Sequence, residues 1–266
     1  MKKTGKRLLA AMLLFCTILI GAAGYEVMAA DEAQSTESTS ETVNSADDLP
    51  GKRIGVQLGT TGDIYVSDYE SDGSGTVVER YNKGADAIQA LKQGKIDCVV
   101  IDEQPAIKFV EQNTGIRILD EEFTLEDYAF VVAKSNTELL DKVNSALEKL
   151  EADGTIADIQ KNYIGTEDEI GKFPYESKDV SHENGTLTVG TNAKFPPYES
   201  YEDGQIVGID MDIMRAVSDE LGMELKIEDM AFDSIIPAIS TGKVDIGAAG
   251  FTVTEERKKN VNFTDT

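Results

Sequence analysis

The stretch FDSIIPAISTGKVDIGAAGFTVTEER, residues 232–257, contains a helix pattern, a glycine turn, an apolar strand pattern and a polar tail, in that order. Apolar residues at helical spacing predict a helix that ends near Gly242. The run VDIGAAG that follows is short and apolar, which is typical of a strand in a parallel sheet. A helix that leads into such a strand is part of a βαβ unit, so this stretch alone indicates an α/β fold.

The same plan recurs on both sides of this stretch. Just before it, the sequence predicts strand, helix and strand at TLTVGT (186–191), GIDMDIMRAVSDELG (208–222) and ELKIE (224–228). Earlier in the chain, strand and helix patterns alternate at RIGVQL (53–58), TVVERY (76–81), GADAIQALKQG (84–94) and IDCVVID (96–102). The last of these shows little polar alternation, so we expect a strand that is buried on both faces. We therefore predict two α/β lobes with mainly parallel sheets around a cleft.

The two halves also share a local frame. ALKQGKID at 90–97 and AISTGKVD at 238–245 both fit A-x-x-x-G-K-x-D. This similarity could mean that the two halves are related repeats. It could also arise because turns that join a helix through glycine to a strand have similar sequences, and both explanations stay open. Between the halves, two amphipathic helix patterns at 136–154 and 155–165 precede a polar loop at 166–185.

The first 30 residues have the features of a secretory signal peptide. A basic start at 2–7 precedes an apolar run at 8–21, and the small residues that follow predict cleavage after Ala29 or Ala30. An uncleaved membrane anchor is the alternative. Residues 31–47 are rich in Ser, Thr and Glu and are expected to form a disordered linker. We expect an exported protein, periplasmic or extracellular and associated with the cell surface.

The amino-acid composition limits which partners the protein can bind and which reactions it can catalyse. The 266 residues include 25 basic and 49 acidic side chains, a formal charge of −24, which argues against nucleic acid as a partner. Without the signal peptide, Cys98 would be the sole cysteine, so neither a disulfide nor a cysteine-based metal site is expected. The only histidine, His182, falls in the polar loop, and the sequence lacks HExxH, GxSxG and GxGxxG motifs. We expect no cofactor and no catalysis, although a lone catalytic glutamate stays open in so acidic a chain.

Candidate binding residues stand after the predicted strands, because ligands of open α/β sheets bind beyond the carboxyl ends of strands. The residues at these positions are Thr60, Thr61, Asp102, Asn192, Phe195, Gly250, Thr252 and Arg257. Two lobes that face each other across a cleft would bring these ends together.

These side chains combine one cation, one anion, hydroxyls and aromatic faces, which together suit a free α-amino acid. Arg257 can hold a carboxylate through two parallel hydrogen bonds, Thr252 can add a hydroxyl, and Asp102 can accept from an ammonium group. Phe195 and Phe232 can stack on the ligand's side chain. Each of these residues also has a plainer interpretation. Arg257 could be an exposed surface arginine, Asp102 a turn residue, and the two phenylalanines part of the core.

Two local patterns would help to hold an anion. TVTEER at 252–257 resembles a capping box, which predicts a helix whose N-terminus favours negative charge. GTTG at 59–62 could donate backbone N–H groups from the other lobe, or could be a simple turn, since it lacks the lysine of a phosphate loop.

With these residues in place, the chain resembles the solute-binding proteins of polar amino acid ABC importers, which have the type II periplasmic binding fold. The segments that carry the resemblance are TVGTNAKFPPYE, GQIVGIDMDIM, FDSIIPAISTGKVDIGAAGFTVTEERKKNVNFTD, GKRIGVQLGTTG and GKIDCVVID. The resemblance implies a monomer that closes on one amino acid and delivers it to a membrane permease.

The resemblance also implies a role for each site residue. Arg257 and Thr252 would hold the ligand carboxylate, with help from Gly250 and Thr61, and Asp102 would pair with the ammonium. Asn192, Phe195 and Phe232 would line the pocket for the ligand's side chain, and Thr60 would stand beside Thr61.

The order of segments departs from the family pattern. The segment now at 186–266 comes first in the family, and the segment now at 48–126 follows after a crossover strand. One account is a circular permutant, with a second lobe at 48–126, a hinge strand at 127–134 and a first lobe at 135–266. The other account is a fragment of a tandem receptor. An enzyme of the dehydratase or lyase type, or a sensor ectodomain, would be the rival functions on the same fold.

Overall fold

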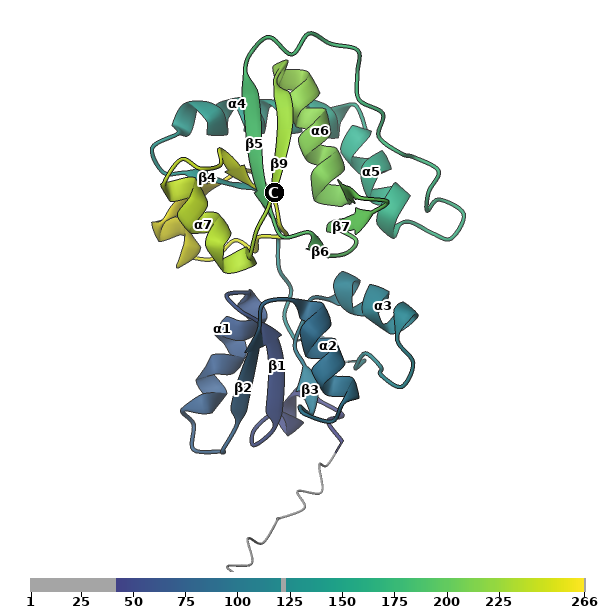
Figure 1. Cartoon of the computed structure of the whole chain (residues 1–266), viewed down its shortest axis with the longest axis vertical. Helices are drawn as coiled ribbons and strands as arrows, with labels where there is room; N and C mark the ends of the chain where they lie inside the picture. The colour runs from purple at the N-terminus through teal and green to yellow at the C-terminus, as the bar shows by residue number, and fades with distance from the viewer. Residues whose placement is uncertain (1–41, 121–122, 266) are drawn as a thin grey trace, which may run out of the picture. The chain divides into compact units, whose positions relative to one another are not determined.

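The computed structural model describes residues 42–120 and 123–265. A three-stranded sheet organises the first part of the chain and a five-stranded sheet organises the second (Figure 1). We call the parts built on them the small lobe (residues 42–120) and the large lobe (residues 130–265). The expected signal peptide lies outside the described residues. Within the described ranges, no helix is long and apolar enough to cross a membrane.

The small lobe has a parallel sheet of order β2-β1-β3. Its strands are β1 (Arg53–Gln57), β2 (Val77–Tyr81) and β3 (Cys98–Val99). Its helices are η1 (Ala46–Asp48), α1 (Thr61–Ser67), η2 (Asp68–Glu70), α2 (Gly84–Lys92) and α3 (Glu103–Gln112). Gly94 follows α2 with a φ of +68°, a conformation that favours glycine, and so turns the chain toward β3. The helix predicted at 84–94 is confirmed.

The large lobe has a mixed sheet of order β11-β4-β10-β5-β9. Its strands are β4 (Val131–Ala133), β5 (Thr186–Thr191), β9 (Glu224–Asp229), β10 (Ile246–Gly247) and β11 (Val261–Phe263). Its helices are α4 (Thr137–Ala152), α5 (Thr155–Ile164), α6 (Ile209–Leu221), α7 (Phe232–Ser240) and η3 (Arg257–Lys259). A small antiparallel sheet adds β6 (Lys194–Phe195), β7 (Glu199–Glu202) and β8 (Gln205–Val207). Strands β9, β5 and β10 are parallel, as predicted, whereas β4 runs antiparallel to β10 and β11.

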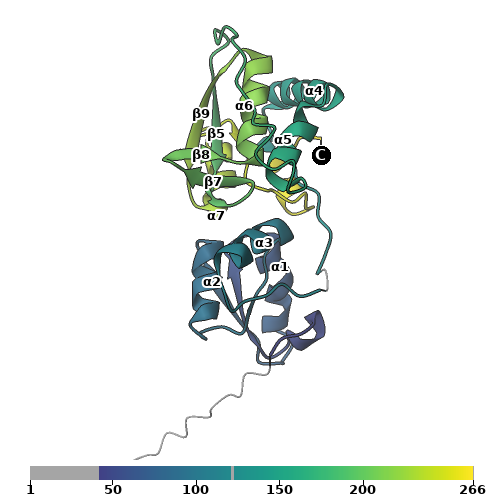
Figure 2. The ribbon, with the colours of Figure 1, turned by 90° about the vertical axis from the view of Figure 1, so that its right-hand side faces the viewer.

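Both faces of the large lobe's sheet are covered, which explains its apolar strands. Val131 and Val132 are fully buried neighbours on β4, yet they belong to different hydrophobic clusters because successive strand residues point to opposite faces. Val132 packs with α4, α5 and α6, which Figure 2 shows together on one side of β5 and β9. Val131 packs with α7. The small lobe has a smaller cluster of its own around Ile54 and Val56.

One segment connects the small lobe to the large sheet along the chain. Tyr128 forms an antiparallel bridge with Thr252, and the N–H of Ala129 donates to the carbonyl of Phe251 at 3.0 Å. The chain then continues into β4, which lies between β11 and β10 in the large sheet. The expected hinge strand at 127–134 therefore lies beside the segment that carries Thr252.

Two expectations about local structure are wrong. The strand predicted at 96–102 is formed only at Cys98 and Val99, and both residues are half-buried rather than covered on two faces, because β3 is an edge strand with one neighbour. Burial still raises the pKa of the Cys98 thiol to about 12, so it remains protonated.

The predicted capping box is also wrong. No helix begins at Thr252, which lies in the bridge with Tyr128. The hydroxyl of Thr254 instead accepts from the N–H of Arg257 at 3.1 Å, beside the short helix η3. The pattern placed the capping hydroxyl two residues too early.

The linker expected at 31–47 ends earlier than predicted. Val43 is buried in the small lobe's cluster, and Arg117 donates to its carbonyl at 3.3 Å and to the side chain of Asn44 at 2.9 Å. A single apolar residue in a polar run is enough to attach this segment to a core. Residues 31–41 lie outside the described ranges.

Candidate binding site

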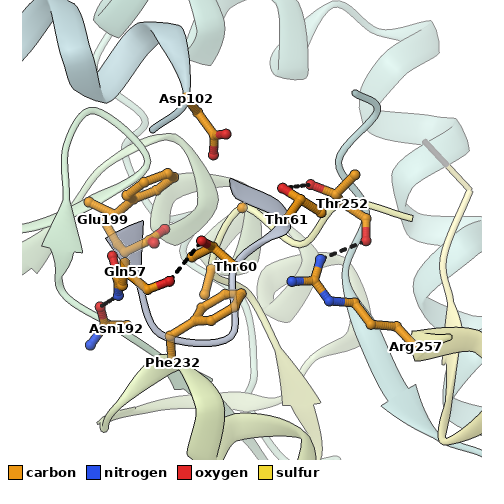
Figure 3. A pocket seen from close by; sticks show the side chains of 12 residues that line it. Gln57, Thr60, Thr61, Asp102, Asn192, Glu199, Phe232, Thr252 and Arg257 are labelled. Carbon is orange, nitrogen blue, oxygen red and sulfur yellow. Dashed lines mark hydrogen bonds between the residues drawn. The ribbon is translucent and has the colours of Figure 1, made fainter. Parts of the chain in front are cut away.

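A cavity lined from both lobes brings all nine candidate residues together. It is lined by Gln57, Thr60, Thr61, Asp102, Asn192, Phe195, Glu199, Phe232, Ala249, Gly250, Thr252 and Arg257 (Figure 3). The parallel strands explain this, because Gln57, Asn192 and Ala249 stand at or just beyond the carboxyl ends of β1, β5 and β10.

The close-up separates two groups of side chains. Thr61, Thr252 and Arg257 lie on one side, and we call them the donor end. Gln57, Asn192 and Glu199 lie on the other side, and we call them the acceptor end.

The cavity is nearly closed in this conformation. The volume open to the centre of a water molecule is about 10 Å³, which is roughly the space that one water requires by this measure. Side chains meet directly across it: the amide of Gln57 donates to Asn192 at 2.9 Å, and Arg257 donates to the carbonyl of Gly59 at 3.1 Å. An amino acid could enter only if the lobes moved apart.

Arg257 is the one cationic side chain among the cavity's lining residues. It is 6% exposed and lies against the rings of Phe232 and Phe251, at 5.4 and 5.5 Å from the ring centres. Its guanidinium donates to the carbonyls of Thr252 (2.9 Å) and Gly59 (3.1 Å). Burial lowers the pKa of Arg257, and the nearby carboxylates of Glu126 and Asp102 oppose that effect. The plainer interpretation of an exposed surface arginine is wrong.

Two threonines, one from each lobe, meet at the donor end. Thr61 is the first residue of α1, with Thr60 as the N-cap, so the GTTG segment is a helix start rather than a simple turn. The hydroxyls of Thr61 and Thr252 are 3.5 Å apart. Both donate to the same carboxylate oxygen of Glu126, at 2.8 and 2.6 Å.

Asp102 precedes α3 and projects into the cavity between the two groups (Figure 3). Its carboxylate accepts from the hydroxyl of Tyr128 at 2.5 Å. Burial raises the pKa of Asp102, against the opposing effect of this hydrogen bond. A cation placed beside Asp102 would remove the cost of holding that charge in a buried site.

The acceptor end contains a carboxyl group without an N–H donor. Glu199 on β7 is fully buried, and neither of its oxygens accepts from an N–H donor among the described residues. Its carboxyl group pairs with that of Asp210, and the two share a hydrogen bond when Glu199 is protonated. Burial, followed by the charge of Asp210, raises the pKa of Glu199 well above its usual range. The side-chain oxygen of Gln57 also lacks a donor there. When Glu199 is ionised, its carboxylate and the oxygen of Gln57 could accept from a ligand group with several N–H donors, whereas protonated Glu199 is partly satisfied by Asp210.

Asp210 is a second buried carboxyl group next to Glu199. It is 7% exposed and accepts from the N–H of Gly250 at 2.9 Å, while burial raises its pKa to about 6. Gly250 has a φ of +57°, and an added Cβ there would lie 3.1 Å from the ring of Phe195. Its N–H is therefore engaged with Asp210, which differs from its expected role in holding a ligand carboxylate.

Each phenylalanine of the cavity wall packs against a second aromatic ring. Phe195 lies against Tyr198 with ring centres 5.8 Å apart, and Phe232 stacks on Phe251 at 4.7 Å. Both phenylalanines line the cavity and also pack against protein, so they are wall residues with one face toward the site.

The sequence analysis missed Gln57, Glu199 and Glu126. Gln57 follows the same rule of strand ends that found its neighbours, and Ala249 stands at such an end beside Gly250. Glu199 lies in the quoted KFPPYES segment, but nothing in its sequence context indicates burial. Glu126 gave no signal, because its contact depends on the path of the chain after α3.

A family model matches most of this chain. The model of bacterial extracellular solute-binding proteins, family 3, matches residues 74–166 and 187–266, which is well over half of the chain. The chain belongs to this family. As a family 3 solute-binding protein it has the two-lobed α/β architecture that the sequence predicted. The first matched stretch covers part of the small lobe and the start of the large lobe, and the second lies in the large lobe.

Individual relatives of this solute-binding protein match shorter stretches. The arginine-binding protein ArgT of Corynebacterium glutamicum is 44% identical over 84 residues, 31% of this chain and 28% of that protein. The arginine-binding extracellular protein ArtP of Bacillus subtilis is 40% identical over 79 residues, 30% of this chain and 31% of that protein. The L-cystine-binding protein TcyJ of Escherichia coli is 30% identical over 127 residues, 47% of each. A solved structure of an ancestral arginine-binding protein bound to arginine is 49% identical, covers 30% of this chain and 36% of that one, and has a TM-score of 0.30. The chain thus spans less than half of each of these proteins.

Proposed function

We propose that this protein binds a free amino acid with a cationic side chain and delivers it to the permease of an ABC importer. The observation that carries the proposal is the buried carboxyl group of Glu199, which no N–H donor of the described residues reaches, in the same cavity as buried Arg257. A single ligand that carries a carboxylate and, several bonds away, a guanidinium or ammonium group would match both.

Each part of such a ligand has a partner. Arg257, Thr61 and Thr252 would hold the α-carboxylate, and Asp102 would accept from the α-ammonium. Glu199 and Gln57 would accept from the cationic side chain, with Phe195 and Phe232 on its faces. A guanidinium suits the acceptor end best, because its five N–H donors can fill several unpaired acceptors at once. Two of the relatives above are named as arginine-binding proteins.

The mechanism would be closure of two lobes on the ligand. The near-closed cavity, the contact of Gln57 with Asn192 and the single connection through residues 123–133 support a motion that opens and closes this gap. The proposal assigns no catalytic role to any residue, so the bound amino acid should be released unchanged. Release of unchanged ligand would distinguish the protein from a dehydratase or lyase on the same fold. We expect it to act as a monomer outside the cytoplasmic membrane.

We also propose that the order of the lobes is permuted relative to other family members. The polar loop 166–185, which joins α5 to β5 within the large lobe, would replace the usual chain ends. Tyr175 and Lys178 fasten this loop to Asp219 on α6, each with a hydrogen bond of 2.7 Å. The permuted order is compatible with one complete site in one chain.

A thermal-denaturation screen of the purified protein against arginine, lysine, histidine, cystine, glutamine and glutamate tests the proposal. Arginine at about one hundred times its dissociation constant should raise the midpoint by roughly 5–10 °C, and lysine by less. The recovered ligand should be chemically unchanged. A shift with glutamate but with no cationic amino acid would reject the ligand class, and no shift with any amino acid would favour a non-binding fragment.

A further inference from the structure

The donor end is already occupied by a carboxylate of the chain itself. One oxygen of Glu126 accepts from the hydroxyls of Thr252 at 2.6 Å and of Thr61 at 2.8 Å. Thr61 belongs to the small lobe and Thr252 to the large lobe, so this one oxygen links the two. These are short, charge-assisted hydrogen bonds of the kind that an anionic ligand would form.

The charge of Glu126 also reaches the arginine. Glu126 is the charged group that most opposes the effect of burial on the pKa of Arg257. Arg257 itself donates to two backbone carbonyls and has no hydrogen bond to Glu126 among the described contacts. Glu126 therefore neutralises the site without using the guanidinium, which remains in place for another carboxylate.

Glu126 is held less completely than a permanent structural residue. Its second oxygen is buried and has no donor within residues 42–120 and 123–265. The residues around it, Thr124, Leu125 and Asp127, are exposed, and Leu125 is 85% exposed. A half-satisfied carboxylate on a largely exposed segment can leave the two hydroxyls when the ligand's carboxylate replaces it there, because few apolar contacts are lost with it.

We propose that Glu126 is an internal competitor that occupies the seat of the ligand's α-carboxylate until the ligand displaces it. This inference rests on the proposed function and adds a residue that sets affinity. The apparent dissociation constant would equal the intrinsic value divided by the fraction of molecules in which Glu126 has left. Competition would act only on ligands that carry an α-carboxylate.

The test measures arginine and agmatine, its decarboxylated analogue, by isothermal titration calorimetry on the full protein and on Glu126→Ala. Arginine should bind Glu126→Ala about ten times more tightly, the change expected for the net contribution of one charge-assisted hydrogen bond. Agmatine has no carboxylate, so the substitution should not improve its binding. Asp127→Asn is the matched control, since it removes one acidic charge from the same exposed segment and should leave both affinities unchanged.

The outcomes separate this inference from the proposed function. If arginine binds wild type and binds Glu126→Ala equally or more weakly, the competitor is rejected while the proposed function stands. If no variant binds any amino acid, the proposed function fails and the inference fails with it. Should Glu126→Ala fold poorly, Glu126→Gln keeps the volume and removes the charge, and it should also tighten arginine binding. Unimproved binding by a folded Glu126→Gln would overturn the proposal.

Discussion

The donor end and the acceptor end of the cavity are left in opposite states. At the donor end, the hydroxyls of Thr61 and Thr252 both have an acceptor, because Glu126 supplies one. At the acceptor end, no N–H donor of the described residues reaches the oxygens of Glu199 or the side-chain oxygen of Gln57, and Glu199 has only its hydrogen bond with the carboxyl group of Asp210. The protein satisfies the first end with a charged group of its own and the second only through a proton shared by two carboxyl groups.

Composition explains the difference. With 49 acidic and 25 basic residues, the chain has carboxylates to spare and few cations to offer. An acidic protein has carboxylates of its own that can occupy an anion-binding site. Buried carboxyl groups that form a cation-binding site need a cation from a ligand, or else they stay protonated and neutral. We infer that the acceptor end selects the ligand's side chain, and that the donor end sets how tightly any amino acid binds.

Removing the donor end's charge should produce the largest effect. Arg257→Ala should weaken arginine binding by about 4 kcal/mol, roughly a thousandfold, because the ligand's carboxylate and Glu126 would then both lack a buried counter-charge. Titration calorimetry measures this change. Lys258→Ala is the control, since Lys258 is exposed and pairs only with Glu255 in the described contacts. Loss of less than tenfold for Arg257→Ala would show that the carboxylate binds elsewhere.

The carboxyl groups at the acceptor end should make the stability of the folded protein depend on pH. Burial raises the pKa of Asp210 to about 6 and that of Glu199 well above its usual range. A carboxyl group with a raised folded-state pKa retains its proton longer in the folded protein than in the unfolded chain. Its contribution to stability therefore falls as pH rises from about 4, where the unfolded group ionises, through about 6.

Asp210→Asn should remove most of this fall while keeping an oxygen for the N–H of Gly250. Between pH 4.5 and 7, urea unfolding should show that the wild type loses up to about 2 kcal/mol more stability than Asp210→Asn. Saturating arginine should shrink the difference, because a bound cation stabilises the ionised carboxylates. Asp179→Asn, in the exposed loop, serves as the control. Equal pH profiles for wild type and Asp210→Asn would mean that the pair is ionised at little cost, and the comparison between the two ends would lose its basis.

The sequence predicted more of the donor end than of the acceptor end, and the reason is physical. Thr61, Thr252 and Arg257 follow strands, and the carboxyl ends of parallel strands meet at one edge whatever the side chains are. Glu199 lies on an antiparallel hairpin, and its burial depends on Asp210, Phe195 and the opposite lobe. The fold class followed from apolar periodicity, whereas the two-residue length of β3 depended on its place at the sheet edge. Glu126 could not have been found, because a residue on an exposed segment reaches the cavity only through the three-dimensional path of the chain.

The most selective test of the acceptor end exchanges its charge and keeps its shape. Glu199→Gln should weaken arginine binding by about 2 kcal/mol, roughly thirtyfold, since the ligand loses a charged partner but keeps a hydrogen-bonding one. Citrulline, which replaces the guanidinium by a neutral urea group, should bind the variant as well as or better than it binds the wild type. Glu202→Gln is the control, because Glu202 is exposed on the same strand. Parallel weakening of arginine and citrulline would show that Glu199 only supports the wall. Reversed preference would show that a buried carboxyl group at this end selects a cation, while Arg257 at the other end binds the carboxylate common to both ligands.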